Sequence, residues 1–533
     1  MPKLWTPSRR HFLGFSAAAL GIGLVTRPSL AQSTPQHGGT LVLVAASEPP
    51  TLTGVVHTGV TDFTGKHTEG LLTYDFDLNP RPLLATSWDV SSDGLTYTFG
   101  LRPGVKWHDG QPFTSADVAF TLGAIKEGHP RGRITFAAVK DIQTPDDLTV
   151  VLKLDRPAPF LLTALGSSET PIVPKHLYDG TKVAENPHNN APVGTGPFKF
   201  KEWVRGSHVE FVRNEDYWDA PRPYLDGLII RFIGDAAARA IALETGEAHI
   251  GASTPIPISD LSRFEALPNI GLERRGYGYK NNLSRIEFNF EHPFFKDVRV
   301  RKAFAHTIDK SVIHQTVNFG YGAVIEGPIV PSLTRFYVPD LPTYAIDTGK
   351  AERLLDEAGF PRGADGIRQR LTLDPLGGSD HHRRSGEYIR QALAAIGVDV
   401  TLRTQDFATY IKRVYTDRDF DFTYHGMSNL FDPTVGVQRL YWSKNFKPGI
   451  PFTNGSGYAS EKVDALLEAA AIEIDPAKRL EQFSEFQRQV IEDLPDINVV
   501  STPDLTLFDK RVVNHTTGAE GIAGNLANAY FAA

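Results

Sequence analysis

The segment Phe420–Pro433 combines an apolar strand pattern with a polar loop. Apolar and polar residues alternate from Phe420 to Met427, which predicts a strand that ends in the loop around Asn429 and Asp432. Ligands of α/β domains bind at the ends of strands. We therefore expect this segment to form a wall of a binding pocket, with Tyr424, Asn429, Phe431 and Asp432 as its contact residues.

The segment Arg439–Lys447 mixes cations with aromatic residues. The planar guanidinium of Arg439 can bind a carboxylate or phosphate through two parallel hydrogen bonds. The ring of Trp442 can stack on a sugar or another ring. The alternative is an ordinary amphipathic segment that faces the core.

Motifs of common enzymes are absent from the sequence. It has no Gly-x-Ser-x-Gly nucleophile turn, no Gly-x-x-x-x-Gly-Lys-Ser/Thr phosphate loop and no His-Glu-x-x-His metal pair. His381 and His382 could suggest a metal site, but Arg383 and Arg384 follow and would repel a cation. We expect a solvated loop there, and a protein that is not an enzyme and needs neither a cofactor nor a metal.

Composition and length narrow the class of protein. Chains beyond about 250–300 residues divide into domains, so 533 residues predict more than one. The net charge of −7 argues against nucleic acid and anionic membranes as partners. The absence of cysteine excludes disulfides, thiolate metal sites and a lipid-modified N-terminal cysteine.

The N-terminal residues resemble a secretory signal. Arg9 and Arg10 precede Phe12-Leu13 as in twin-arginine signals, although Gly14 stands where a basic residue is usual. The uncharged run from Phe12 to Val25 is shorter than the roughly 20 residues that span a bilayer, and a small-residue cleavage site ends at Ala31. We expect a twin-arginine signal peptide over residues 1–31 and a periplasmic protein that is not a lipoprotein and has no membrane span after cleavage. The alternative is a single membrane anchor.

A hairpin followed by a capped helix is predicted over residues 95–121. Leu95–Leu101 alternates as a half-buried strand, Pro103-Gly104 fits a type II turn, and residues 105–107 resume the alternation. Thr114 and Asp117 have the spacing of a capping box, which predicts a helix start.

The second half of the chain predicts an α/β lobe. Apolar residues repeat at helical spacing in residues 300–308, 389–396 and 463–470. Gly359 is placed to end a helix that begins near Ala351. The alternation of strands and helices through residues 345–425 favours a largely parallel sheet.

The order of residues from Arg102 to Thr121 also resembles the signature of the extracytoplasmic solute-binding proteins of family 5, the receptors of peptide, nickel and opine ABC importers. Further landmarks of this family follow in order, so that the resemblance covers about residues 38–510. They are residues 38–40, 84–88, 174–178, 194–198, 213–218 and 242–250, with His249 where the family commonly has Asp.

The resemblance implies an α/β, two-lobed periplasmic binding protein fold (type II, cluster C) with an extra subdomain inserted in lobe one. The lobes would close on a ligand by a hinge motion. The expected parts are residues 32–280 for lobe one, about 75–170 for the inserted subdomain, 281–495 for lobe two and 496–533 for a C-terminal return to lobe one.

The resemblance also implies binding residues. Glu48, Thr195 and Asn289 fall near the cleft of relatives. In peptide-binding relatives the loop reads Asp-Tyr-x-Asp/Glu-Pro, and its first Asp pairs with the free amine of the ligand. This chain has Asn429 four residues before Pro433. An amide lacks the negative charge for that ionic contact. Asn429 therefore argues against ordinary peptides, and together with Arg439 it favours anionic solutes as ligands.

The resemblance thus implies a periplasmic substrate-binding receptor that captures a small-molecule ligand by lobe closure and delivers it to ABC permease and ATPase subunits. The ligand would be a peptide, an opine-like or other anionic conjugate, or a nickel chelate, and we expect a monomer. The alternatives are an exported hydrolase and a chaperone-like or sensory binding protein on the same fold.

Overall fold

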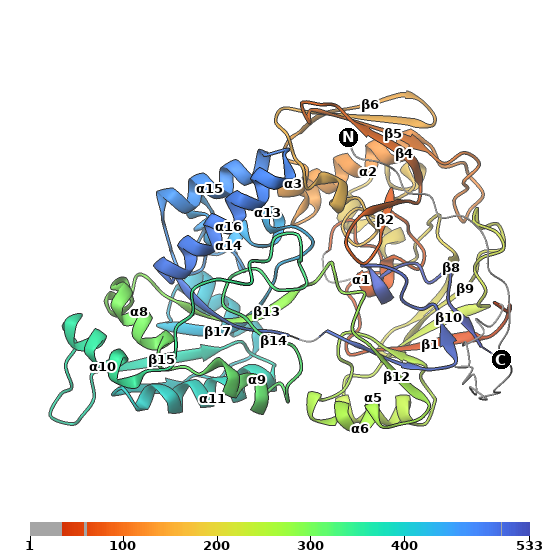
Figure 1. Ribbon diagram of the computed structural model, residues 1–533. Coiled ribbons are helices and arrows are strands. Elements are labelled where there is room, and N and C mark those ends of the chain that lie inside the picture. Colours follow the sequence, from red (N-terminus) through yellow and green to blue (C-terminus); the bar gives the residue numbers. More distant parts are fainter. Residues whose placement is uncertain (1–34, 58–60, 503, 533) are drawn as a thin grey trace, which may run out of the picture. The chain divides into compact units, whose positions relative to one another are not determined.

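The computed structural model describes residues 35–57, 61–502 and 504–532. The predicted signal peptide, residues 1–31, lies outside them. The described chain is built around two large mixed sheets and a smaller antiparallel sheet (Figure 1).

The first large sheet has the strand order β12-β19-β11-β1-β10-β9-β8. Its central strand β1, Thr40–Ala45, pairs in parallel with β10, Gly227–Phe232, and β11, Ile250–Gly251. The other strands pair antiparallel: β8 Phe198–Val204, β9 His208–Arg213, β12 Ile270–Glu273 and β19 Thr506–Asp509. Helices α5, Ala236–Glu244, and α6, Leu261–Glu265, lie side by side next to this sheet (Figure 1).

The smaller sheet belongs to the predicted inserted subdomain. Its order is β4-β5-β7-β6, all antiparallel, with β4 Ala85–Val90, β5 Thr96–Leu101, β6 Val139–Asp146 and β7 Thr149–Leu154. Helix α2, Ser115–Gly128, begins at the predicted capping box, where the Asp117 carboxylate accepts from the Thr114 amide at 2.9 Å.

The predicted second hairpin strand, residues 105–107, is not formed. Both edges of β5 are already bonded, to β4 and to β7, so no edge remains for it. Lys106 makes only an isolated bridge with Pro112.

The second large sheet has the order β14-β18-β13-β17-β15-β16. Its strands are β13 Asn282–Phe288, β14 Ala323–Val324, β15 Gln369–Pro375, β16 Val398–Leu402, β17 Phe422–Ser428 and β18 Asp496–Ser501. The predicted parallel pairing is confirmed where helices alternate with strands, because β15 pairs in parallel with β16 and β17. Strand β13 pairs antiparallel with β17 and β18, so the whole sheet is mixed.

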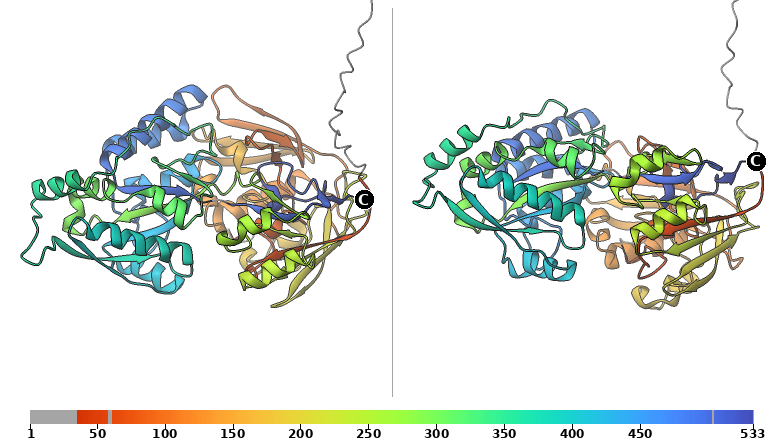
Figure 2. Two further views of the ribbon diagram at one scale, coloured as in Figure 1. Left: turned by 60° about the horizontal axis from the view of Figure 1, so that its bottom comes forward. Right: turned by 90° about the horizontal axis from the view of Figure 1, so that it is seen from below.

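The second half of the described chain also contains larger helices. They are α8 Val298–Ala305, α10 Thr348–Glu357, α11 Asp380–Ala394, α15 Glu461–Ile472 and α16 Pro476–Asp493. Phe304, Leu355 and Ile389 of the first three share a buried core with Ile286 and Phe422 of the sheet. Helices α15 and α16 pack side by side (Figure 2).

The described chain also contains shorter α-helices and two-stranded ribbons. The short helices are α1 Thr61–Thr64, α3 Gly132–Thr135, α4 Lys175–Tyr178, α7 Pro293–Lys296, α9 Lys310–Thr316, α12 Phe407–Ile411, α13 Pro433–Gly436 and α14 Gln438–Tyr441. Two-stranded ribbons join β2 Leu72–Tyr74 to β3 Pro80–Pro82 and β20 Val512–Val513 to β21 Tyr530–Phe531.

The chain returns to the first sheet after Ser501 and not at residue 496 as we expected. Strand β18 pairs with β13 and β14 of the second sheet, whereas β19 pairs with β11 and β12 of the first. The crossover therefore lies between β18 and β19.

A fully buried ion cluster joins the central strands of the second sheet. Arg285 of β13 contacts Glu287 at 3.0 Å and Asp496 of β18 at 2.9 Å. His425 contacts Glu287 at 2.7 Å, and the Tyr441 hydroxyl donates to Asp496 at 2.6 Å. Burial alone would raise the pKa of Glu287, but Arg285 and His425 outweigh it and lower that pKa to about 2.

Candidate functional site

The strongest candidate site lies at one edge of the second sheet. Strand β13 begins there and its neighbours β17 and β18 end there, since Asn282 pairs with Ser428 and Leu283 with Ser501. A cavity of about 950 Å³ opens at this edge. Its polar uncharged lining includes Asn282, Ser284, Ser428 and Thr502.

The charged side chains that line this cavity are all cationic. They are Arg131, Arg133, Arg439 and Lys447, and no Asp or Glu is among the lining residues. Arg131 pairs with Glu169, whose Oε2 accepts from its Nε at 2.9 Å. Within the described part of the chain, no carboxylate pairs with the other three cations. The cavity therefore has the charge to bind an anion.

Arg439 on α14 is half-buried and has no carboxylate partner among the described residues. Its Nη1 donates to the Phe452 carbonyl at 2.7 Å, its Nε to that of Gly436 at 3.1 Å and its Nη2 to that of Ser428 at 3.2 Å. Burial, together with the nearby Arg131, lowers the pKa of Arg439 to about 10. It stays protonated at neutral pH, held by carbonyl dipoles and not by a counter-ion.

A second, smaller cavity of about 220 Å³ adjoins the first. The two share Arg131, Asn282, Ser428 and Leu430 in their walls. The second cavity is lined by charges of both signs, among them Glu169, Lys280 and Glu520. The charged lining is therefore cationic in the first cavity and contains both cations and carboxylates in the second.

Among the predicted pocket residues, Arg439 lines the cavity. Asn429 does not, although Ser428 and Leu430 on either side of it do. The Asn429 side chain is fully buried; its Nδ2 donates to the Pro328 carbonyl at 2.9 Å and its Oδ1 accepts from the Val330 amide at 2.9 Å. Its amide joins the loop to the segment 328–330.

The other residues of the predicted wall point into the protein. Phe431 is buried against the ring of Tyr279 at 5.0 Å between centroids. Asp432 is buried and binds both terminal nitrogens of Arg479, at 2.7 and 2.9 Å. Trp442, of the predicted segment Arg439–Lys447, is not among the residues that line the cavity, and its indole donates to Glu468 on α15 at 2.8 Å.

Tyr424 is buried behind the cavity wall. Its hydroxyl lies 3.5 Å from the Nε2 of His381, and its ring packs against His382. His382 itself lines the cavity. The expected solvated loop at these histidines is wrong, because both belong to α11 and His382 is 9% exposed.

The three residues inferred by resemblance lie apart from the cavity. Glu48 accepts from the Gly206 amide at 3.0 Å, in the turn between β8 and β9. Thr195 is buried and donates to Glu69 at 3.1 Å. Asn289 follows the far end of β13, where its Nδ2 donates to the Phe420 carbonyl at 2.8 Å and its Oδ1 accepts from Arg418 at 3.0 Å.

Sequence reasoning missed Arg131, Arg133, Lys447 and His382. Arg131 and Arg133 lie about three hundred residues before Arg439, and α3 carries Arg133. Lys447 belongs to the cation-rich segment Arg439–Lys447 and lines the cavity beside Arg439. The basic pair Arg131-Gly132-Arg133 was the one available signal, and only the fold brings it to Arg439.

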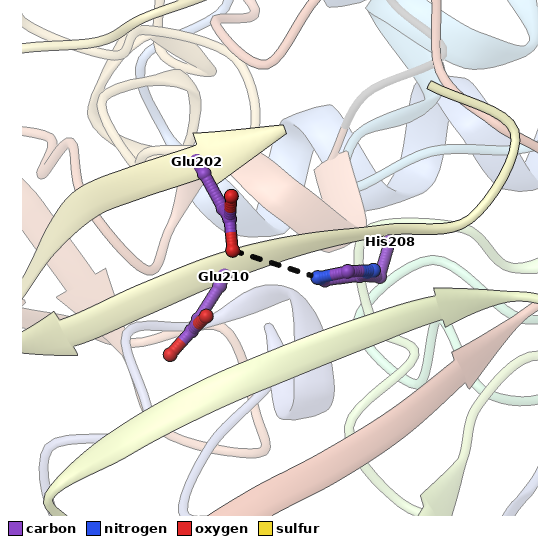
Figure 3. A group of neighbouring side chains, drawn as sticks. All are labelled: Glu202, His208 and Glu210. Carbon is purple, nitrogen blue, oxygen red and sulfur yellow. Dashed lines mark ion pairs between the residues drawn. The ribbon is translucent and has the colours of Figure 1, made fainter. Parts of the chain in front are cut away.

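One group of described residues has metal-ligating chemistry outside this site. Glu202, His208 and Glu210 of the hairpin β8–β9 bring two carboxylates and an imidazole within 4.8 Å of one another (Figure 3). His208 contacts Glu202 at 4.0 Å, and Lys201 donates to Glu210 at 2.8 Å. The Lys201 ammonium therefore already binds one of the candidate ligands.

None of the helices in the described ranges has the length and apolar character needed to cross a membrane.

Comparison with known proteins agrees with the two-lobed fold expected from the resemblance. Residues 79–449 match the model of the bacterial extracellular solute-binding proteins, family 5. A Brucella ovis protein named as an ABC transporter peptide-binding protein is 31% identical over 502 residues, covering 90% of this chain and 91% of its own.

Two solved structures show the same architecture. The oligopeptide-binding protein AppA of Bacillus subtilis, in complex with a nonapeptide, is 26% identical with a TM-score of 0.79, covering 94% of this chain and all (100%) of its own. AgaA of A. tumefaciens R10, in complex with agropinic acid, is 28% identical with a TM-score of 0.76, covering 92% and 99%. The chain belongs to the bacterial extracellular solute-binding proteins of family 5, a family of two-lobed binding proteins.

Proposed function

We propose that this protein is the periplasmic receptor of an ABC importer and captures a peptide-like or opine-like solute that carries an anionic group. The observation that carries the proposal is the cavity of about 950 Å³ lined by four cations and no carboxylate. It lies at the sheet edge next to the two crossings between the large sheets, one between β12 and β13 and the other between β18 and β19. Closure of lobes about such crossings is a common way to enclose a ligand.

The solved relatives support both kinds of proposed ligand, peptide-like and opine-like. AppA is described with a nonapeptide and AgaA with agropinic acid. A permease and an ATPase would receive the solute, since the chain has no phosphate-binding loop of its own.

The proposal is tested by thermal unfolding of the mature protein against a library of peptides, opines and other small acids. Ligand at 100 times its Kd adds about 2.7 kcal/mol of stability, so binders raise the Tm measurably. A library in which no solute of any class raises the Tm would contradict the receptor function.

Asn429 gives a prediction about peptide recognition. The Asn429→Asp substitution introduces a negative charge at a fully buried position. The new carboxylate cannot donate to the Pro328 carbonyl, so that hydrogen bond is lost. We expect the free energy of unfolding to fall by about 1–3 kcal/mol, without any new preference for peptides with a free amine. Urea unfolding and binding of a dipeptide with and without N-acetylation measure both.

The matched control for this substitution is Asn190→Asp, which makes the same charge change at an exposed position. It should leave both readouts nearly unchanged. A stable Asn429→Asp variant that now discriminates in favour of the free amine would show that Asn429 faces the ligand.

Export by the twin-arginine route is part of the proposal, and its support is the pattern around Arg9 and Arg10. Replacing both by lysine should leave the uncleaved precursor inside the cell, detected by fractionation and immunoblotting. Normal cleavage and periplasmic recovery of that variant would contradict this route.

A further inference from the structure

We propose that the cavity selects solutes with at least two negative charges, bound as a polyanion with Arg439 as the central partner. This inference rests on the proposed receptor function and narrows its ligand class to di- or tricarboxylates and comparable conjugates.

The first support is the charge count around the cavity. Of the four lining cations, only Arg131 has a carboxylate partner among the described residues, Glu169. Arg133, Arg439 and Lys447 remain without one. A solute with one carboxylate can compensate one of these three charges, whereas a dianion or trianion compensates two or all of them.

The second support is the hydrogen-bonding state of Arg439. A guanidinium has five N–H donors, and three of those on Arg439 bind the carbonyls of Ser428, Gly436 and Phe452. The three carbonyls fix the plane of the group, and one N–H on each terminal nitrogen is left over. Two such donors match the two oxygens of a carboxylate.

The third support is a polar side chain without a partner at the same cavity. His382 is 9% exposed, and neither of its ring nitrogens has a hydrogen-bond partner among the described residues. Buried polar groups normally have partners. Burial lowers the pKa of His382 to about 3, so it is a neutral imidazole with one N–H to donate. Both ring nitrogens are themselves buried, so a solute group that partners them must first displace the side chains that cover them.

The positions of the cations predict how much each contributes. Arg439 is half-buried, so an anion that reaches it leaves water and gains a strong charge-assisted contact. Arg133 and Lys447 are exposed, and salt screens their contributions. Arg439 should therefore set most of the preference for polyanions, and the exposed pair should make it depend on ionic strength.

Isothermal titration of the mature protein with the dipeptides Glu-Glu and Gln-Gln tests the inference. The two are matched in size but carry three carboxylates and one. We expect Glu-Glu to bind at least about tenfold more tightly, since one charge-assisted hydrogen bond corresponds to roughly 10- to 100-fold in Kd. Arg439→Gln should remove most of this preference, and Lys447→Gln should reduce it a few-fold at low salt.

Arg301→Gln is the matched control. Arg301 is buried, is likewise held by backbone carbonyls, of Leu494 at 2.9 Å and Asp493 at 2.7 Å, and likewise has its pKa lowered to about 10 by burial. It is not among the residues that line the cavity, so its replacement should lower stability and keep the preference for Glu-Glu. If Arg439→Gln does not fold, Lys447→Gln still tests the inference, because Lys447 is exposed and its replacement should leave the fold intact.

Equal affinity for the two dipeptides, or a preference that survives both Arg439→Gln and Lys447→Gln, would overturn the inference. So would binding of neither dipeptide by a protein that neutral solutes stabilise, and the receptor function would then still stand. The receptor function fails by a separate result, the absence of thermal stabilisation by any solute class.

Discussion

Asp432→Asn is expected to lower the free energy of unfolding by about 3–5 kcal/mol, the usual cost of breaking one partner of a buried ion pair. Asp432 is 3% exposed and Arg479 is 6% exposed. Both terminal nitrogens of Arg479 bind the carboxylate, and its Nε also donates to the Ala470 carbonyl at 2.9 Å. The substitution leaves the guanidinium buried without its counter-charge. Urea unfolding measures the effect.

The double variant Asp432→Asn, Arg479→Met separates pairing from packing. It should be less destabilised than the sum of the two single variants, because the second replacement removes the stranded charge. The exposed pair Arg488–Asp340, at 3.4 Å, gives a control in the same lobe. Asp340→Asn should change stability by about 0–1 kcal/mol. A loss below about 1 kcal/mol in Asp432→Asn would mean that its carboxylate is free to contact ligand, as the sequence had suggested.

Arg285→Met is the second substitution with a large expected effect, again about 3–5 kcal/mol. The side chains of Arg285, Glu287 and Asp496 are 1–2% exposed, so removal of the guanidinium leaves two carboxylates buried side by side. Burial would lower the pKa of Arg285, but Asp496 and Glu287 outweigh it and raise that pKa. The cation is therefore held in its charged form by both acids.

Because the cluster joins β13, β17 and β18, its loss should also loosen the sheet edge that lines the cavity. Hydrogen exchange of the amides near Ser284 and Ser428 should become faster in Arg285→Met. Arg370→Met is the control, since Arg370 pairs with Asp365 at the surface, at 2.7 Å. Unchanged stability and exchange in Arg285→Met would contradict the structural role of the cluster.

Local sequence signals predicted local structure well. The capping box of Thr114 and Asp117 and the glycine that ends α10 were readable because their partners lie within a few residues. Gly104 and Gly359 adopt the positive φ that their predicted turns require, 75° and 89°. Residues 105–107 failed as a strand because strand formation depends on a free edge, and β4 and β7 occupy both edges of β5.

The site was predictable only in part. The strand that ends at Ser428 and the cation Arg439 were found, because a strand pattern and a basic residue are visible in one short segment. The inward orientation of the Asn429 side chain could not be predicted, because its hydrogen-bond partners Pro328 and Val330 lie about a hundred residues away in the sequence. Arg131 lines the same cavity although it lies about three hundred residues before Arg439, and no short-range pattern indicates such a contact.

Native mass spectrometry of the gently purified protein, beside its Arg439→Gln variant, tests the central claim most directly. We predict an added mass on the wild type that fits one small solute with two or more acidic groups, and its loss from the variant. An added mass that fits a neutral or cationic peptide, retained by Arg439→Gln, would contradict the claim.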